Sequence, residues 1–156
     1  MSWPVAELDA VARMRVLAAA LPGAFVAEAV LDAPFDRVWA VAADLENELP
    51  RLLRTIRSVR IVRDDGEDLA ADITGHFGLR DSFDIVLRPG WCVMQSGRVV
   101  GGMAAVAEGS GTRFAFLGAF RVPVTRPLGP VLRLAGRPLG RGMHARLRDR
   151  VTEGEG

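Results

Sequence analysis

The sequence contains no lysine and no tyrosine, and it has a single cysteine, Cys92. All 20 basic residues are therefore arginines. Without lysine the chain cannot form a Schiff base or a phosphate-binding loop of the GxxxxGK[ST] type, and without tyrosine it has no phenolic acid or nucleophile. One cysteine excludes an internal disulfide and a cysteine-rich zinc site, so the cysteine content gives no sign of an oxidising compartment.

Long apolar runs are also missing, because no stretch approaches the roughly 18 apolar residues of a membrane-spanning helix. The N-terminal segment has a short apolar patch over 16–21, and it carries Glu7 and Asp9 where a secretion signal carries positive charge. With 156 residues the chain has the length of one domain. We therefore expect a single domain over residues 1–156 of a cytoplasmic protein.

The net charge of +1 is unevenly distributed. Residues 1–120 hold 12 arginines and 16 acidic residues, whereas residues 121–156 hold 8 arginines and 3 acidic residues. This basic segment is either a solvated helix face or a surface that attracts an anionic partner, such as an anionic membrane contacted through Arg133, Arg137 and Arg141. Nucleic-acid binding is not predicted, because the segment has neither an aromatic platform nor a recognised motif.

The first 54 residues contain three helical segments and one strand by pattern. Apolar residues at helical spacing predict an amphipathic helix over 4–21, and residues 24–32 are typical of a strand. Residues 33–54 predict a helical hairpin, with Pro34 in its first turn and a second short helix that begins near Glu46. We expect residues 1–23 to form an N-terminal extension of a core over 24–151.

Residues 55–120 alternate with a period of two and predict strand after strand. Asp64 to Glu67, Pro89-Gly90 and residues 109–111 are typical of the turns between them. Residues 127–151 return to a helical pattern, in which Pro138 predicts a kink or a split near the middle. The tail, 152–156, is expected to fray. The order predicts an α+β fold, with six or seven antiparallel strands curved around a long C-terminal helix.

A strongly curved sheet around one helix predicts a hollow that the helix cannot fill, and such a hollow is typically an apolar pocket. Glycines within the strands favour the bulges and bends that this curvature needs. The expected lining is the apolar face of the strands and of the helices. It comprises Trp39, Leu53, Ile73, Phe83, Ile85, Met94, Met103, Phe116, Leu132, Leu139 and Met143.

Two polar residues in the strand region are weak catalytic candidates. Alternation places His76 on the face opposite the apolar residues, unless the neighbouring glycines reverse it locally. Arg98 is either a surface residue beside a hairpin or a buried cation that binds a carboxylate or carbonyl. His144 is expected to face solvent on the basic helix, and Cys92 to be a small core residue. The two histidines lack a third ligand, so neither a metal nor a cofactor is predicted.

Several segments resemble the START-related helix-grip superfamily, in its polyketide cyclase/dehydrase and coenzyme Q-binding branch. The resemblance covers nearly the whole chain from about residue 24. It is carried by APFDRVWAVAADLENELPRLLRTIRSVRIV, by HFGLRDSFDIVLRPG, and by EGSGTRFAF followed by an arginine-rich helix. It implies a helix-grip fold with a hydrophobic ligand cavity.

Three functions are compatible with such a cavity, because one fold hosts many activities. The first is binding of a lipid, quinone or polyketide-like molecule for carriage or sequestration. The second is a polyketide cyclase or dehydratase that folds its substrate with help from a polar group. The third is a protein-interaction module. An ionisable side chain inside the cavity would favour catalysis, a wholly apolar lining would favour binding, and a solid core would favour the interaction module.

Overall fold

The computed structural model describes residues 8–78, 80–121 and 125–153, without the side chains of residues 77, 125–133 and 135. The expected helix start at Pro4 and the side chains of Leu132 and Arg133 therefore lie outside the described residues. Of the tail that was expected to fray, Thr152 and Glu153 continue the last helix, and residues 154–156 lie outside the description.

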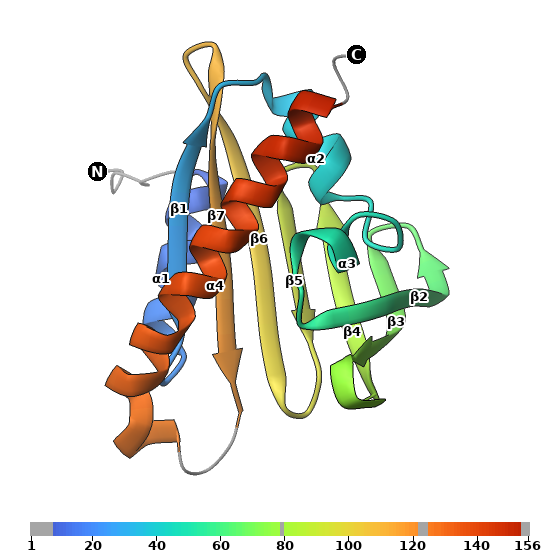
Figure 1. Ribbon diagram of the computed structural model, residues 1–156, viewed down its shortest axis with the longest axis vertical. Helices are drawn as coiled ribbons and strands as arrows, with labels where there is room; N and C mark the ends of the chain where they lie inside the picture. The colour runs from blue at the N-terminus through green and yellow to red at the C-terminus, as the bar shows by residue number, and fades with distance from the viewer. Residues whose placement is uncertain (1–7, 79, 122–124, 154–156) are drawn as a thin grey trace, which may run out of the picture.

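Within the described residues, seven strands form one antiparallel sheet in the order β1-β7-β6-β5-β4-β3-β2 (Figure 1). Every neighbouring pair from β2 to β7 is consecutive in sequence, whereas β1 joins the far edge beside β7. The strands are β1 (Phe25–Leu31), β2 (Ile56–Asp65), β3 (Asp68–Gly75), β4 (Arg80–Arg88), β5 (Trp91–Gln95), β6 (Val99–Glu108) and β7 (Gly111–Phe120). The predicted α+β helix-grip architecture is confirmed.

Helices cover both faces of this sheet. The long helix α4 (Thr125–Glu153) crosses one face together with the short helices α2 (Phe35–Ala42) and α3 (Leu49–Leu52), and α1 (Ala10–Ala20) lies behind β1 and β7 (Figure 1). Side chains along β7 point alternately to the two faces of the sheet. Phe114 and Phe116 belong to the core under α4, and Ala115 and Leu117 belong to the core under α1. Asp9 caps α1 by accepting a hydrogen bond from the backbone of Ala12 at 2.8 Å.

Helix α4 is held against β1 by residues spaced four apart along one face. Gly136 contacts the Phe25 ring and Gly140 contacts the Ala27 side chain so closely that a methyl group at either glycine would overlap them. One turn further on, His144 Nε2 donates a hydrogen bond to the carbonyl of Ala27 at 3.0 Å. The two glycines therefore set how closely the helix approaches the strand.

Three arginines in the C-terminal half of α4 form hydrogen bonds with residues of other elements. Arg146 Nε donates to the carbonyl of Leu52 at 2.7 Å, and Arg148 donates to the carbonyl of Val30 at 3.3 Å. Arg150 forms two hydrogen bonds with the Glu48 carboxylate, at 2.7 and 2.8 Å. Arg146 and Arg150 thus fix α4 to the segment that joins α2 to β2, and Arg148 fixes it to β1.

The structure contradicts the expected split of α4 and the expected exposure of His144, whereas a kink at Pro138 stays a prediction. Pro138 does not split it, because Thr125–Glu153 is one continuous helix. A proline removes a single helical hydrogen bond, and here Gly136 and Gly140 dock the helix on both sides of it. His144 does not face solvent: it is 4% exposed, because the glycine face that precedes it draws it against β1.

The tight contact at Gly140 makes a prediction about stability. Gly140→Ala should lower the free energy of unfolding by about 1–3 kcal/mol, because the new methyl group would lie 2.4 Å from the Ala27 Cβ, which cannot move without the strand. Gly142→Ala on the same helix is the matched control. Its methyl group would lie 3.1 Å from the end of the Arg146 side chain, where a shift of a few tenths of an ångström relieves the contact without moving a strand, so helix propensity should leave stability equal or raised by up to about 1 kcal/mol. Urea unfolding of both variants measures the difference, and equal effects would contradict this packing.

Candidate functional site

A cavity of about 380 Å³ lies between α4, the start of β2 and the inner face of the sheet. Its volume falls within the range of about 300–1,000 Å³ that is typical of small-molecule sites. Its 16 lining residues come from all seven strands, from α4 and from the segment after α3. They are Phe25, Leu53, Thr55, Ile56, Ile73, Phe83, Met94, Val99, Val100, Gly101, Phe116, Leu117, Gly118, Ala119, Phe120 and Leu139.

The hollow exists because two neighbouring strands have glycine at paired positions. Gly101 on β6 lies opposite Gly118 on β7, so the inner face of the sheet has no side chain at either position. Met94 flanks this pair on β5 and Phe25 flanks it on β1. The Phe25 ring lies over Gly118, so the gap in this cross-strand row is at Gly101.

The lining is apolar. Among the 16 residues, Thr55 contributes the only polar side chain, and none is ionisable. Thr55 and Phe120 are also exposed to solvent, so the cavity opens between the start of β2 and the end of β7. A lining of this kind holds an apolar molecule by burial of its surface, and among its described residues Thr55 is the only one whose side chain carries an exchangeable proton.

The structure brings together six of the residues expected to bind ligand: Leu53, Ile73, Phe83, Met94, Phe116 and Leu139 all line the cavity. The other described ones lie in the core outside it. Trp39 stacks on Phe35 with ring centroids 6.4 Å apart. The remaining three are fully buried among core side chains: Ile85, Met103 and Met143. Contact of any of these residues with a ligand remains a prediction.

Neither weak catalytic candidate lies in the cavity. His76 begins a short 3₁₀ turn, His76–Gly78, and its side chain is exposed. Arg98 is exposed in the turn between β5 and β6, where its backbone N–H donates to Ser96 Oγ at 3.1 Å. Among the described residues, no group of three or more metal-ligating side chains comes together.

The buried imidazole of His144 is the ionisable group that sequence reasoning missed. The ring meets Phe114 edge-on with centroids 5.8 Å apart, and Nδ1 is buried with no hydrogen-bond partner among the described residues. Burial lowers the pKa of His144 below its ordinary value. The hydrogen bond to Ala27 raises this pKa, and the positive charge of Arg148 lowers it further. The signal in the sequence was the spacing of Gly136, Gly140 and His144, which places the histidine on the docking face.

Cys92 behaves as a core residue. Its side chain is fully buried, and burial raises the pKa of the thiol to about 12. The thiolate that would act as a nucleophile is therefore not formed near neutral pH.

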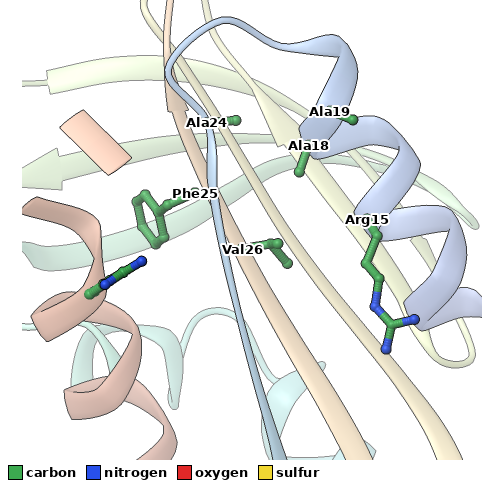
Figure 2. Close-up of a pocket in the computed structure, with 7 residues that line it drawn as sticks. Arg15, Ala18, Ala19, Ala24, Phe25 and Val26 are labelled. Carbon is green, nitrogen blue, oxygen red and sulfur yellow. The ribbon is translucent and has the colours of Figure 1, made fainter. Parts of the chain in front are cut away.

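A second hollow, of about 450 Å³, lies on the surface between α1 and α4 across the start of β1 (Figure 2). Figure 2 shows Phe25 and Val26 on opposite sides of the strand and Arg15 reaching from α1. The Arg15 guanidinium is held by the Glu28 carboxylate, with two hydrogen bonds of 2.5 Å that lower the pKa of Glu28. Arg137 of α4 also lines this hollow, whereas the described lining of the cavity between α4 and the sheet is uncharged, so we take that cavity as the candidate site.

No protein-family model matches the sequence, and no curated protein matches it. Several solved structures match the fold of the chain. The structure of TTHA0849 from Thermus thermophilus has a TM-score of 0.62 and 20% identity, over 85% of this chain and 99% of that one. The Zhui aromatase/cyclase from Streptomyces sp. R1128 has a TM-score of 0.61 and 13% identity, over 83% and 93% of the two chains. The chain has the helix-grip fold.

A third solved structure with this helix-grip fold is norcoclaurine synthase from Thalictrum flavum in complex with dopamine and hydroxybenzaldehyde. It has a TM-score of 0.59 and 18% identity, over 83% of this chain and 86% of that one. In the described part of the present chain, no helix is both long and apolar enough to cross a membrane. The helix-grip resemblance inferred from the sequence is thus confirmed at the level of the fold.

Burial of a neutral His144 predicts a pH-dependent stability. The folded-state pKa is depressed, so below about pH 6.5 the unfolded chain binds a proton that the folded chain does not. The free energy of unfolding should then fall by up to about 1.4 kcal/mol per pH unit until the folded-state pKa is reached. Urea unfolding at pH 7.5 and 5.5 should show this loss in wild type and in the exposed-site control His76→Gln. It should be smaller in His144→Gln, and an equal loss in all three proteins would refute the assignment.

Proposed function

We propose that this protein binds a small hydrophobic molecule in the cavity between α4 and the sheet, for carriage or sequestration. The observation that carries the proposal is the lining of the cavity, a space of about 380 Å³ that opens at one side and whose described walls have one hydroxyl and no charge. Burial of apolar surface contributes roughly 25 cal/mol per Å², so such walls favour a lipid, a quinone or a polyketide-like body over a polar one.

Catalysis receives less support from this site. A cyclase or dehydratase needs a polar group within hydrogen-bond reach of the atoms that react. His76 and Arg98 lie outside the cavity, and the buried His144 does not line it. Aromatase/cyclase and synthase activities occur among the solved structures of similar fold, but the described lining of this chain offers Thr55 alone for such a role.

The third reading, a protein-interaction module, was expected to have a solid core. The paired glycines Gly101 and Gly118 instead leave a hollow beside well-packed core residues such as Met103 and Phe114, which are fully buried. Hydrophobic ligand binding makes use of that hollow, whereas a module that acts through its surface has no need of it.

Filling the hollow tests the proposal. A side chain at Gly101 would point into the cavity, since a Cβ built there finds its nearest neighbour, Met94 Cε, at 3.6 Å. Gly101→Leu should keep the fold and abolish the fluorescence increase that a neutral apolar probe, N-phenyl-1-naphthylamine, shows with wild type. Gly97→Leu is the control, because Gly97 is exposed and a Cβ there meets nothing within 4 Å.

Three results decide the matter. Loss of probe binding in Gly101→Leu with retention in Gly97→Leu supports the cavity as the site. Undiminished binding in a folded Gly101→Leu protein would reject it, and so would failure of wild type to bind the probe. Circular dichroism and urea unfolding establish that each variant is folded.

A further inference from the structure

Phe25 lies where two hollows of the molecule meet. We keep the word cavity for the space between α4 and the sheet, and we call the hollow between α1 and α4 the surface hollow. Among the described lining residues, Phe25 is the only one that belongs to both spaces. Figure 2 shows its ring between β1 and α4. The residue is therefore at the boundary between the cavity and the surface hollow.

The Phe25 ring fills the space between the sheet and α4 at this boundary. A methyl group at Gly118 of β7 or at Gly136 of α4 would overlap the ring, so the ring lies against both glycines. Phe116 of β7 meets the ring edge-on, with centroids 5.7 Å apart. Gly118 and Phe116 both line the cavity, so the ring closes the cavity on the side of β1.

The two sides of α4 face different spaces. Leu139 lines the cavity, whereas Arg137 lines the surface hollow. Residues two apart in a helix are about 200° apart around its axis, so these side chains leave α4 on opposite sides. Gly136 and Gly140, which contact β1, lie between them on the helix surface. The contact between α4 and β1 thus separates the two spaces, and Phe25 is the side chain that fills it at Gly136.

The surface hollow would accept an apolar chain if it were joined to the cavity. Five of its seven described lining residues are apolar, and the other two are Arg15 and Arg137. The described lining of the cavity is uncharged. Phe25 therefore keeps the cavity apart both from further apolar surface and from two charged side chains.

We propose that Phe25 sets the maximum length of the ligand, by closing the cavity at the contact between α4 and β1. This inference rests on the proposed function and adds a specificity-determining residue to it. The ligand class that follows is a compact apolar molecule that ends at the Phe25 ring, rather than a long chain that passes between α4 and β1. The limit is steric, because a chain can pass only if the ring leaves its place between Gly118 and Gly136.

Straight-chain alcohols from 1-hexanol to 1-tetradecanol measure this limit by displacing N-phenyl-1-naphthylamine from the full-length protein. Burial of each added methylene should raise the affinity by up to about fourfold while the chain still enters the cavity. Once the cavity is filled, further methylenes extend into solvent through its opening and add little. The affinity of wild type should therefore stop rising within the series, and the alcohol at which it stops gives the length limit.

Two variants then test the role of Phe25. Phe25→Ala should move the limit to longer alcohols, because the chain can continue into the surface hollow. Phe83→Ala is the matched control, since Phe83 is a phenylalanine that lines the cavity and does not line the surface hollow. Loss of either ring frees room in the cavity, so the limit should move further in Phe25→Ala. The excess affinity should be up to about fourfold for each methylene that enters the surface hollow.

Loss of a buried ring can unfold a protein, so urea unfolding accompanies the binding measurements. Phe25→Leu and Phe83→Leu form a second pair with a smaller loss of packing. The same order of length limits is expected for this pair, with a smaller difference between its members.

The outcomes separate this inference from the proposed function. An equal shift of the limit in both members of a folded pair, or no shift in either, overturns the role of Phe25 and leaves hydrophobic binding in place. So does a wild-type affinity that rises through the whole series, or that is absent for every alcohol while the probe binds. Failure of wild type to bind either the probe or the alcohols overturns both proposals.

Discussion

The close contact between α4 and β1 is the constraint on which the rest of the structure depends. Gly136 and Gly140 let the helix lie directly on Phe25 and Ala27, and His144 then reaches the edge strand with a hydrogen bond. A helix docked over one edge of a curved sheet cannot also cover the middle of it. The remaining inner face is closed by α2, α3 and the start of β2, and the cavity lies where these two coverings do not meet.

An unfilled interior is a cost for a protein, because close-packed side chains gain dispersion contacts that a void forfeits. Here the void arises from Gly101 and Gly118, which are partners in adjacent strands. Gly101 has room for a larger side chain, so filling the space is sterically allowed, whereas at Gly118 the Phe25 ring occupies that room. The glycine at position 101 therefore enlarges a hollow that the position of α4 leaves open.

Much of this fold could be predicted because it is encoded locally. Period-two alternation and turns such as the one at Gly66 define the six consecutive strands β2 to β7, and each pairs with its neighbour in sequence. The site was harder to predict from the sequence. An apolar pattern shows that Trp39 and Met143 point inward, but it cannot show whether an inward side chain meets another side chain or a void. The burial of His144 depends on a strand more than 100 residues away in the sequence. The arginines next to His144 in the sequence instead predicted that its side chain would face solvent.

The basic C-terminal segment divides into two parts with different roles. Arg146, Arg148 and Arg150 are engaged with the Leu52 carbonyl, the Val30 carbonyl and the Glu48 carboxylate, so their charge serves to fasten α4. Arg137 and Arg141, by contrast, are exposed. A count of charges along the sequence merges these parts and suggests a uniform basic helix.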